Sequence, residues 1–315
     1  MTIKKIVLHI GMEKTGSTSI QNTFAENRDR LRSANCLYPI SLGAANHTKL
    51  ALYASSFEPP FVTRFLNVNT ENEFENWRIA TTHEFFQELD GSNEELLVLS
   101  CEWLAHRIVK EKEFKRLLGL LSSVTENISI VMYIRRQDQL AVSRYTAALW
   151  AGESNEFKFP VNPDAQAGIY NFNSIYEKWR EYFSDIHVRI FERTAFHKQN
   201  LLSDFCHVCG LDYAQVCVDG DTRTDNQSFS EDGQILLREF NKLVLDTVLD
   251  GTRLQPVRNY RELVGRIHTG KHLPCKRSEA MKFASMFEES NEMLKSKCFP
   301  ELTTLFSQKF DNYTD

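Results

Sequence analysis

Apolar residues gather in four short runs along the chain, and each run has the length of a β-strand. The runs cover residues 4–10, 96–100, 128–134 and 187–191. Segments between them repeat their apolar positions about every 3.6 residues, as amphipathic helices do. This alternation continues to about residue 210. It predicts an α/β fold of three layers, with a central parallel sheet flanked by helices.

The segments with helical periodicity are the second part of the pattern. In the first of them, Ile20, Phe24 and Leu31 recur on one side and should face the core. A short extended piece, residues 36–39, follows that helix, and Gly210 ends a later one. We expect helices at residues 17–33, 73–89, 110–122, 171–183, 230–249 and 277–297.

The domain organisation follows from length and continuity. A chain of 315 residues permits one large α/β domain or two small ones. No internal repeat, low-complexity tract or linker divides it. We therefore predict a single domain over residues 1–315, with a core at about residues 3–230 and a helical extension at about 230–315.

Composition narrows the class of protein. The formal net charge of −5 argues against a nucleic-acid binder, whose domain would be basic. No apolar run approaches the roughly 20 residues of a membrane span. The N-terminus lacks the apolar segment of a signal peptide, so a cytoplasmic protein is expected. The seven cysteines are an odd, scattered set that suggests reduced thiols. Cys206 and Cys209 form a CxxC pair on an amphipathic helix, where core packing is favoured over metal or redox chemistry.

The end of the first apolar run carries candidate chemistry. Gly11 ends the run, Gly16 follows five residues later, and three hydroxyl residues then open a helix. A strand, a tight loop and a helix N-terminus together make an anion cradle of backbone N–H groups. The spacing is nearly that of a nucleotide-binding P-loop. However, Ser17 stands where a Walker loop has lysine, and the lysine comes earlier, at Lys14.

A second constellation follows the third apolar run. Arg135 stands directly after it, and Ser143 comes eight positions later on a helical segment, for which Asp138 is the expected N-cap. Arginine offers a planar fork to two phosphate oxygens, and a serine in the first turns of the helix adds a hydroxyl donor. The pair therefore suits a phosphate group.

Together the two motifs resemble those of sulfotransferases that use 3′-phosphoadenosine-5′-phosphosulfate (PAPS). Residues 14–19 resemble the family's 5′-phosphosulfate loop, and residues 135–143 resemble its 3′-phosphate motif. Both lie at strand-to-helix junctions, in the family's order and at roughly its separation. The resemblance covers about residues 3–230. It implies the P-loop-containing sulfotransferase fold and PAPS as co-substrate, with no metal.

The resemblance also implies roles for single residues. Lys14 would contact the sulfate and the bridging oxygen, while Arg135 and Ser143 would hold the 3′-phosphate. Glu102 stands at the end of the second run, at the place of the family's catalytic base, and a glutamate there is more like the carbohydrate sulfotransferases. Residues 223–228 loosely resemble a segment that closes over the nucleotide. The 5′-phosphate would be bound through backbone amides and hydroxyls by Thr15, Gly16, Ser17, Thr18 and Ser19.

Several alternatives stay open. Glu13 and Glu26 compete with Glu102 as the base. A P-loop kinase or NTPase, or a non-catalytic nucleotide-binding protein, competes with the sulfotransferase. The acceptor is expected to be a small molecule or glycan bearing a hydroxyl. An insertion at residues 40–90 offers a place for an acceptor-binding segment, and its role stays open. In that insertion the Asn46–His47 pair is expected to be a helix cap with an exposed histidine, in preference to a substrate contact.

Overall fold

The computed structural model describes residues 2–161, 168–217, 231–247, 260, 263–264 and 275–313. The chain divides into two compact units, Met1–Ile134 with Phe172–Arg223, and Arg135–Asn171 with Thr224–Asp315. The described helices of the predicted extension fall in the second unit. The organisation as one domain stays a prediction, and each unit is described by itself.

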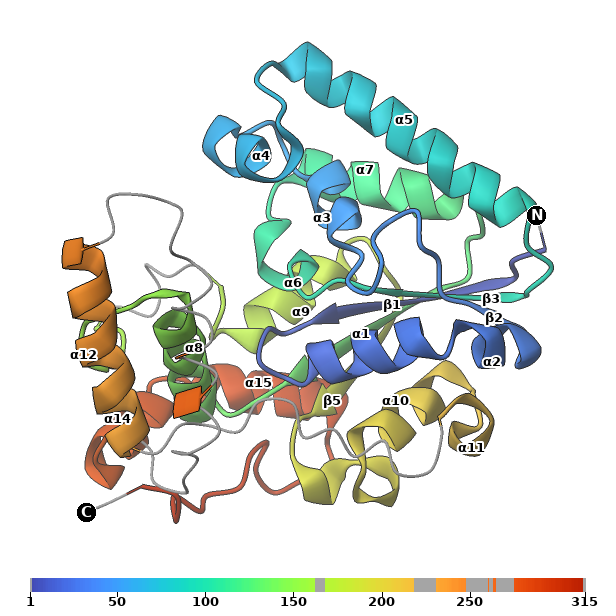
Figure 1. The fold of residues 1–315 in the computed structure, drawn as a ribbon. Coiled ribbons are helices and arrows are strands. Elements are labelled where there is room, and N and C mark those ends of the chain that lie inside the picture. The colour runs from blue at the N-terminus through green and yellow to red at the C-terminus, as the bar shows by residue number, and fades with distance from the viewer. Residues whose placement is uncertain are drawn as a thin grey trace. The chain divides into compact units, whose positions relative to one another are not determined.

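Five parallel strands form the centre of the first unit, in the order β2-β3-β1-β4-β5 (Figure 1). The predicted parallel sheet is confirmed, and all four apolar runs are strands in it. β1 lies between β3 and β4, so the strand order reverses at β1. Ligands of open α/β sheets bind at the carboxyl ends of the strands at such a switch point. The strands are β1 (Lys5–Gly11), β2 (Cys36–Leu37), β3 (Leu96–Ser100), β4 (Ile128–Ile134) and β5 (Asp185–Ile190).

Helices cover both faces of this sheet, which confirms the three layers (Figure 1). One face carries α1 (Ser17–Glu26), α2 (Arg28–Ser33), α10 (Leu201–Cys209) and α11 (Tyr213–Val216). The other carries α3 (Thr48–Ala54), α5 (Glu71–Asp90), α7 (Glu111–Ser122) and α9 (Phe172–Arg180), with α9 packed on α7 through the rings of Phe114 and Trp179. The remaining short elements of this unit are α4 (Pro59–Leu66), α6 (Leu104–Arg107) and the 3-10 turns η1 (Arg193–Ala195) and η2 (His197–Gln199).

The helix expected at residues 17–33 is two helices that meet at Asn27. Asn27 is the C-cap of α1, and both its side chain, at 2.8 Å, and its backbone N–H, at 3.1 Å, donate to the Thr23 carbonyl. The predicted inward face is nevertheless correct, because Ile20, Phe24 and Leu31 are all fully buried. The short polar side chain of Asn27 therefore bends the chain without changing which face packs on the sheet.

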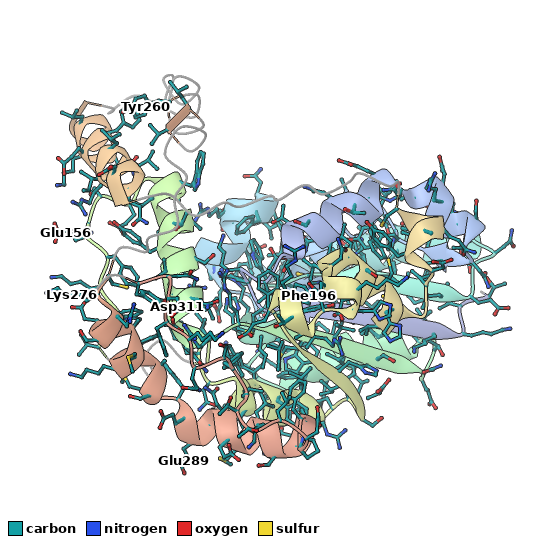
Figure 2. All side chains as sticks on the ribbon, turned by 90° about the horizontal axis from the view of Figure 1, so that it is seen from below. Glu156, Phe196, Tyr260, Lys276, Glu289 and Asp311 are labelled. Carbon is teal, nitrogen blue, oxygen red and sulfur yellow. The ribbon has the colours of Figure 1, made fainter. Side chains whose placement is uncertain are left out.

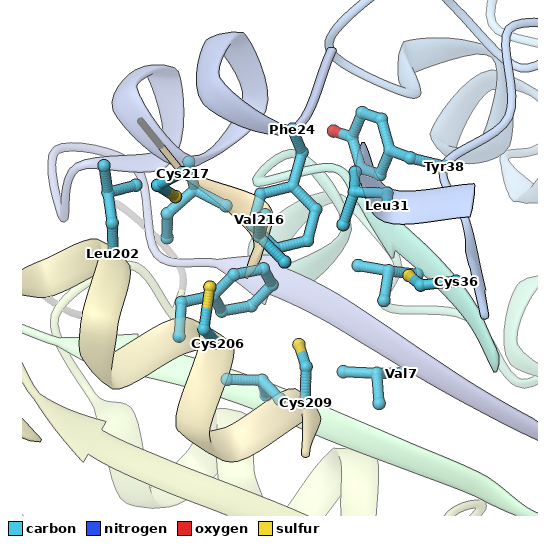
Figure 3. Close-up of a cluster of buried hydrophobic side chains, with 14 of the residues drawn as sticks. Val7, Phe24, Leu31, Cys36, Tyr38, Leu202, Cys206, Cys209, Val216 and Cys217 are labelled. Carbon is cyan, nitrogen blue, oxygen red and sulfur yellow. The ribbon is translucent and has the colours of Figure 1, made fainter. Parts of the chain in front are cut away.

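The core beneath α1 and α10 contains four of the cysteines (Figure 3). Cys206 and Cys209 pack there with Cys36 and Cys217, and burial raises the pKa of the Cys206 and Cys209 thiols, with a hydrogen bond to Cys217 the larger cause for Cys206. A thiol held in its neutral form is a poor nucleophile and a poor metal ligand. The prediction that the CxxC pair serves core packing is confirmed.

The regular elements described in the second unit are helices, and α8 packs against both α12 and α14. Tyr260 stacks on Phe240 of α12, with 4.0 Å between ring centroids (Figure 2). The single helix expected at residues 277–297 is two helices, separated by a turn at Met286 and Phe287. The helices are α8 (Gln137–Ala151), α12 (Glu231–Thr247), α14 (Arg277–Ser285) and α15 (Glu288–Cys298).

Candidate active site

The loop between β1 and α1, residues 11–16, has the backbone of an anion cradle. Three of its residues have left-handed backbone angles, with φ of 93° at Gly11, 64° at Lys14 and 77° at Gly16. Gly16 is the N-cap of α1 and no side chain caps the helix, whose first turn carries no acidic residue. The first N–H groups of α1 therefore keep their capacity to bind an anion.

Hydrogen bonds centred on Met12 fix the shape of this loop. The Met12 N–H donates to the Tyr133 carbonyl of β4 at 2.8 Å. The Met12 carbonyl accepts from the Thr15 hydroxyl at 2.5 Å and the Ser17 hydroxyl at 3.3 Å. Thr15 and Ser17 are buried, whereas Thr18 is exposed. Two of the hydroxyls predicted to bind phosphate thus close the loop on itself, and their backbone N–H groups stay compatible with the predicted role.

Glu102 lies against the loop. A Cβ on Gly11 would lie 2.7 Å from the Glu102 Cβ and 2.8 Å from its Cα, so only glycine permits this approach. The register explains the contact, because β1 and β3 run parallel with His9 opposite Ser100, two residues before Glu102. The structure therefore brings the predicted base and the predicted phosphosulfate loop together within the first unit.

Two amide side chains donate to the Glu102 carboxylate. Gln21 Nε2, on the second turn of α1, lies 2.7 Å from Oε2. Asn46 Nδ2 lies 3.0 Å from each carboxylate oxygen. Sequence reasoning missed Gln21, although its position on the second turn of the helix that leaves the loop was a usable signal.

The expectation of an exposed His47 is wrong. His47 stands at the N-cap position of α3 but is fully buried, and its side chain does not cap the helix. Its Nδ1 accepts from the Ser100 N–H at 2.9 Å, and its Nε2 donates to the Pro39 carbonyl at 3.0 Å. Burial lowers its pKa to about 4. The neutral ring continues the hydrogen bonding of β3. This tertiary contact could not be predicted from the sequence around His47.

His9, inside β1, is a further buried polar residue near the loop. Its Nδ1 is 2.8 Å from the Ser100 hydroxyl, which also accepts from Gln21 Nε2 at 3.2 Å. Its ring contacts those of Tyr133 and Phe205, and burial lowers its pKa to about 3. A neutral histidine and a hydroxyl therefore support the side chain that holds Glu102.

The two competing carboxylates have other surroundings. Glu13 lies on the loop, with its Oε1 3.5 Å from Nε2 of His106 on α6. Glu26 is exposed at the last position of α1, a helix of ten residues and hence about 15 Å long. Of the three candidates, Glu102 is the one bonded by two amides at the strand end.

Arg135 and Ser143 belong to the second unit. Arg135 directly follows β4, and its Nε donates to Gln139 Oε1 at 3.3 Å. Burial lowers the pKa of the Arg135 guanidinium. Ser143 is half-buried on α8. A guanidinium that has lost water gains more from an anionic ligand than an exposed one does.

Arg136, the next residue, has a structural role. Its guanidinium forms two bonds with the Asp138 carboxylate, at 2.7 and 2.9 Å, and donates to the carbonyls of Ser307 and Lys309. Tyr313 donates to the same carboxylate at 2.5 Å. The expectation that Asp138 caps α8 is therefore wrong. Arg136 occupies the N-cap position, and the Asp138 side chain is engaged by charged and hydroxyl partners instead.

Other predictions concern ligands and membranes. Within the described ranges no three His, Cys, Asp or Glu side chains are placed to hold a metal ion, and the absence of a metal stays a prediction. No described helix is both long and apolar enough to cross a membrane. Residues 223–228, the predicted segment over the nucleotide, lie outside the described residues.

Comparisons with known proteins give the following. No protein-family model matches the chain. An uncharacterized protein of Archaeoglobus fulgidus is 27% identical over 210 residues, which are 63% of this chain and 52% of that protein. The chain thus spans about half the length of the curated relative that it matches.

Two solved structures are similar to the chain, each at 12% sequence identity. One is a sulfotransferase from Alicyclobacillus acidocaldarius, with a TM-score of 0.45, covering 81% of this chain and 96% of that chain. The other is the sulfotransferase domain from the curacin biosynthetic pathway, with a TM-score of 0.34, covering 91% of this chain and 98% of that chain.

Proposed function

We propose that the chain is a PAPS-dependent sulfotransferase, which moves the sulfuryl group from PAPS to an acceptor hydroxyl, on a carbohydrate, with Glu102 as general base. The observation that carries the proposal is the contact between Glu102 and the glycine loop. A carboxylate lies beside the loop whose lysine position resembles that of sulfotransferases. A Walker-type NTPase would have its lysine at Ser17, whose hydroxyl donates to the Met12 carbonyl.

The transfer is an in-line displacement at sulfur. The acceptor oxygen forms a bond to sulfur while the bond from sulfur to the bridging oxygen of the phosphate breaks. Glu102 takes the proton of the acceptor hydroxyl, a role typically worth about 10²–10⁴-fold in rate. Negative charge grows on the leaving phosphate, where the Lys14 ammonium and the N–H groups at the start of α1 oppose it.

Recognition of the nucleotide would use the arginine after β4. Arg135 would hold the 3′-phosphate through its planar fork, and Ser143 would add a hydroxyl donor. The Arg136 guanidinium is hydrogen-bonded to Asp138 and to two backbone carbonyls, which supports Arg135 as the residue that binds the 3′-phosphate.

Calorimetry of ligand binding tests the proposal. Adenosine 3′,5′-bisphosphate (PAP), the product nucleotide, should bind and stabilise the protein against heat. ATP with Mg²⁺ should bind much more weakly, since it lacks the 3′-phosphate. Stabilisation by ATP with Mg²⁺ alone would overturn the proposal in favour of a kinase or NTPase. PAP binding without transfer to any of a broad panel of acceptors would leave a nucleotide-binding protein.

A further inference from the structure

Glu102 is held by side chains from two separate segments, the first turns of α1 and residues 39–47. We propose that Gln21 and Asn46 are positioning residues, which fix the Glu102 carboxylate in the orientation from which it takes the acceptor's proton. The inference rests on the proposed function. It adds two residues that neither motif contains.

The three contacts fill most of the carboxylate's capacity. An ionised carboxylate offers about four lone-pair sites. Gln21 donates to Oε2 at 2.7 Å, and Asn46 donates to both oxygens at 3.0 Å. An amide is neutral across the whole working range of pH, so these donors orient the carboxylate without competing for the acceptor's proton. The remaining site is the one from which Glu102 accepts the acceptor's proton.

Hydrogen bonds to the rest of the first unit fix the segment of residues 39–47, which carries Asn46. His47 fixes the segment to β3 at both ends of Ser100, since its backbone N–H donates to the Ser100 carbonyl and its ring accepts from the Ser100 N–H, each at 2.9 Å. The Tyr38 hydroxyl donates to the Ala45 carbonyl at 2.6 Å, and Arg28 donates to the Ala44 carbonyl. A side chain held by such a frame can orient its partner.

Gln21 is held just as firmly from the other side. It is 4% exposed, and its Nε2 also donates to the Ser100 hydroxyl, which pairs with the neutral ring of His9. Ser100 therefore connects both halves of the arrangement, by its backbone to the 39–47 segment and by its side chain to Gln21. The Glu102 carboxylate therefore lies between Gln21 and Asn46, and both are tied to Ser100 at the end of β3.

The pH dependence of transfer distinguishes a positioning role of Gln21 from an effect on the stability of the fold. Gln21→Glu places a second carboxylate at the 2.7 Å contact, and like charges at that distance raise the pKa of the pair. The acid limb of the kcat/KM profile should move up by about one pH unit or more. Gln21→Met, which keeps the length and removes the donor, should lower kcat about ten-fold or more with little change in the KM for PAPS.

Other titratable groups around Glu102 stay the same in these variants. Burial raises the pKa of Tyr38, and raises that of Cys101 to about 12, while the charge of Glu102 acts on both in the same direction. Glu13 and His106 form their own pair nearby. His9 is the other titratable neighbour, because its ring pairs with the Ser100 hydroxyl that Gln21 also contacts. An NMR titration that follows Glu102 itself separates protonation of the carboxylate from protonation of His9.

Asn46→Ala gives an independent reading. It should lower kcat about ten-fold or more and leave PAP affinity within about two-fold of wild type, because the amide touches the base and not the nucleotide. Gln215→Glu, at an exposed position of α11, and Asn127→Ala, at an exposed position directly before β4, are matched controls and should change neither kcat nor the pH profile. Retained PAP affinity shows that each variant is folded.

An acid limb that stays in place in Gln21→Glu, or an unchanged kcat in Asn46→Ala, would overturn the inference while the sulfotransferase proposal stands. Carbon NMR titration of Glu102 in isotopically labelled protein is the readout without turnover. A wild-type protein that transfers nothing from PAPS would overturn the proposed function. An NMR titration of Glu102 that is unmoved by Gln21→Glu would by itself overturn the positioning role of Gln21.

Discussion

Glu102 and Lys14 are assigned different tasks, and their surroundings give a way to separate them. Glu102 is bonded to amides at the end of β3, on the acceptor's side of the proposed reaction. Lys14 lies at the turn of the glycine loop with a left-handed backbone, where its charge would face the sulfate. A base acts on the acceptor alone, whereas a cation beside the sulfate acts on both the bound nucleotide and the transition state.

Substitution should therefore divide their effects. Glu102→Gln should lower the transfer rate by about two to four orders of magnitude with PAPS affinity nearly unchanged. Lys14→Ala should weaken both turnover and PAPS binding. Glu26→Gln, at an exposed helix end, is the control and should do little. Initial rates beside calorimetric affinities decide the matter. Loss of transfer in Glu26→Gln with an active Glu102→Gln would place the base on α1.

Two buried histidines should make stability depend on pH. Burial lowers the pKa of His9 to about 3 and that of His47 to about 4. The unfolded chain binds these protons below a pKa of about 6.5, so unfolding is favoured as the pH falls. Each histidine should lower the free energy of unfolding by up to about 1.4 kcal/mol for each pH unit by which the pH falls from the unfolded towards the folded pKa value. The stabilisation is complete above about pH 6.5.

Urea unfolding at a series of pH values from 7 to 5 measures this effect, as a slope of unfolding free energy against pH. His9→Phe suits the aromatic surroundings and removes one titrating group. The variant should take up about one proton fewer on unfolding, so its unfolding free energy should change less steeply with pH than that of wild type. Equal slopes in the two proteins would show that His9 is protonated in the fold.

The candidate residues of the two units differ in how far the sequence points to them. Lys14, Arg135 and Glu102 are candidates because each stands at a fixed offset from an apolar run. Asn46 and His47 were misjudged because their contacts, Glu102 and Ser100, lie just after β3 and at its end, more than 50 residues away. Such pairings depend on the fold of residues 39–47, which carry no periodic pattern to locate them.

The connection of β1 to α1 depends on a close approach of two backbones. Gly11 combines a φ of 93° with the contact to Glu102, and both requirements exclude a Cβ. Gly11→Ala should destabilise the protein by about 1–3 kcal/mol, because it strains the backbone and displaces the end of β3. Transfer should fall with it, since Glu102 moves.

The matched control is Gly119→Ala on α7. A Cβ there meets nothing within 4 Å, so alanine should stabilise the helix by about 0.5–1 kcal/mol. Denaturant unfolding of both variants gives the comparison. A Gly11→Ala protein as stable and as active as wild type would mean that Glu102 is not held against the loop.

Among the secondary structure elements, the buried strands were the most predictable. Residues 96–100 and 128–134 are strands with the expected bounds, because a continuous apolar run buried on both faces leaves little choice of register. The helices at 17–33 and 277–297 were each expected as one and are two. Their breaks depend on local hydrogen bonds and packing that the apolar period does not record.

At the scale of the whole chain, the two arginines after β4 are assigned different roles. Arg135 is proposed to bind the nucleotide, and Arg136 stabilises the second unit. Arg135→Ala should weaken PAP binding by roughly 1.5–3 kcal/mol and leave adenosine 5′-phosphate binding unchanged, with a smaller loss for Ser143→Ala. Arg136→Ala should instead destabilise the second unit by about 3–5 kcal/mol, because it leaves the Asp138 carboxylate buried without its cation.

Calorimetry with the two nucleotides and thermal unfolding of the two variants check these expectations. Wild-type protein that binds adenosine 5′-phosphate as tightly as PAP would contradict the assignment of Arg135. An Arg136→Ala variant of wild-type stability would contradict the structural role of Arg136.

The central claim, transfer of a sulfuryl group from PAPS, is tested most directly by radiolabelled PAPS incubated with the purified protein and a carbohydrate-rich cell extract. The account predicts that label enters an acceptor as PAP is released in equal amount, and that Glu102→Gln abolishes most of this transfer while still binding PAP. Protein that binds PAP yet moves no label into any acceptor, or that consumes ATP with Mg²⁺ instead, would contradict it.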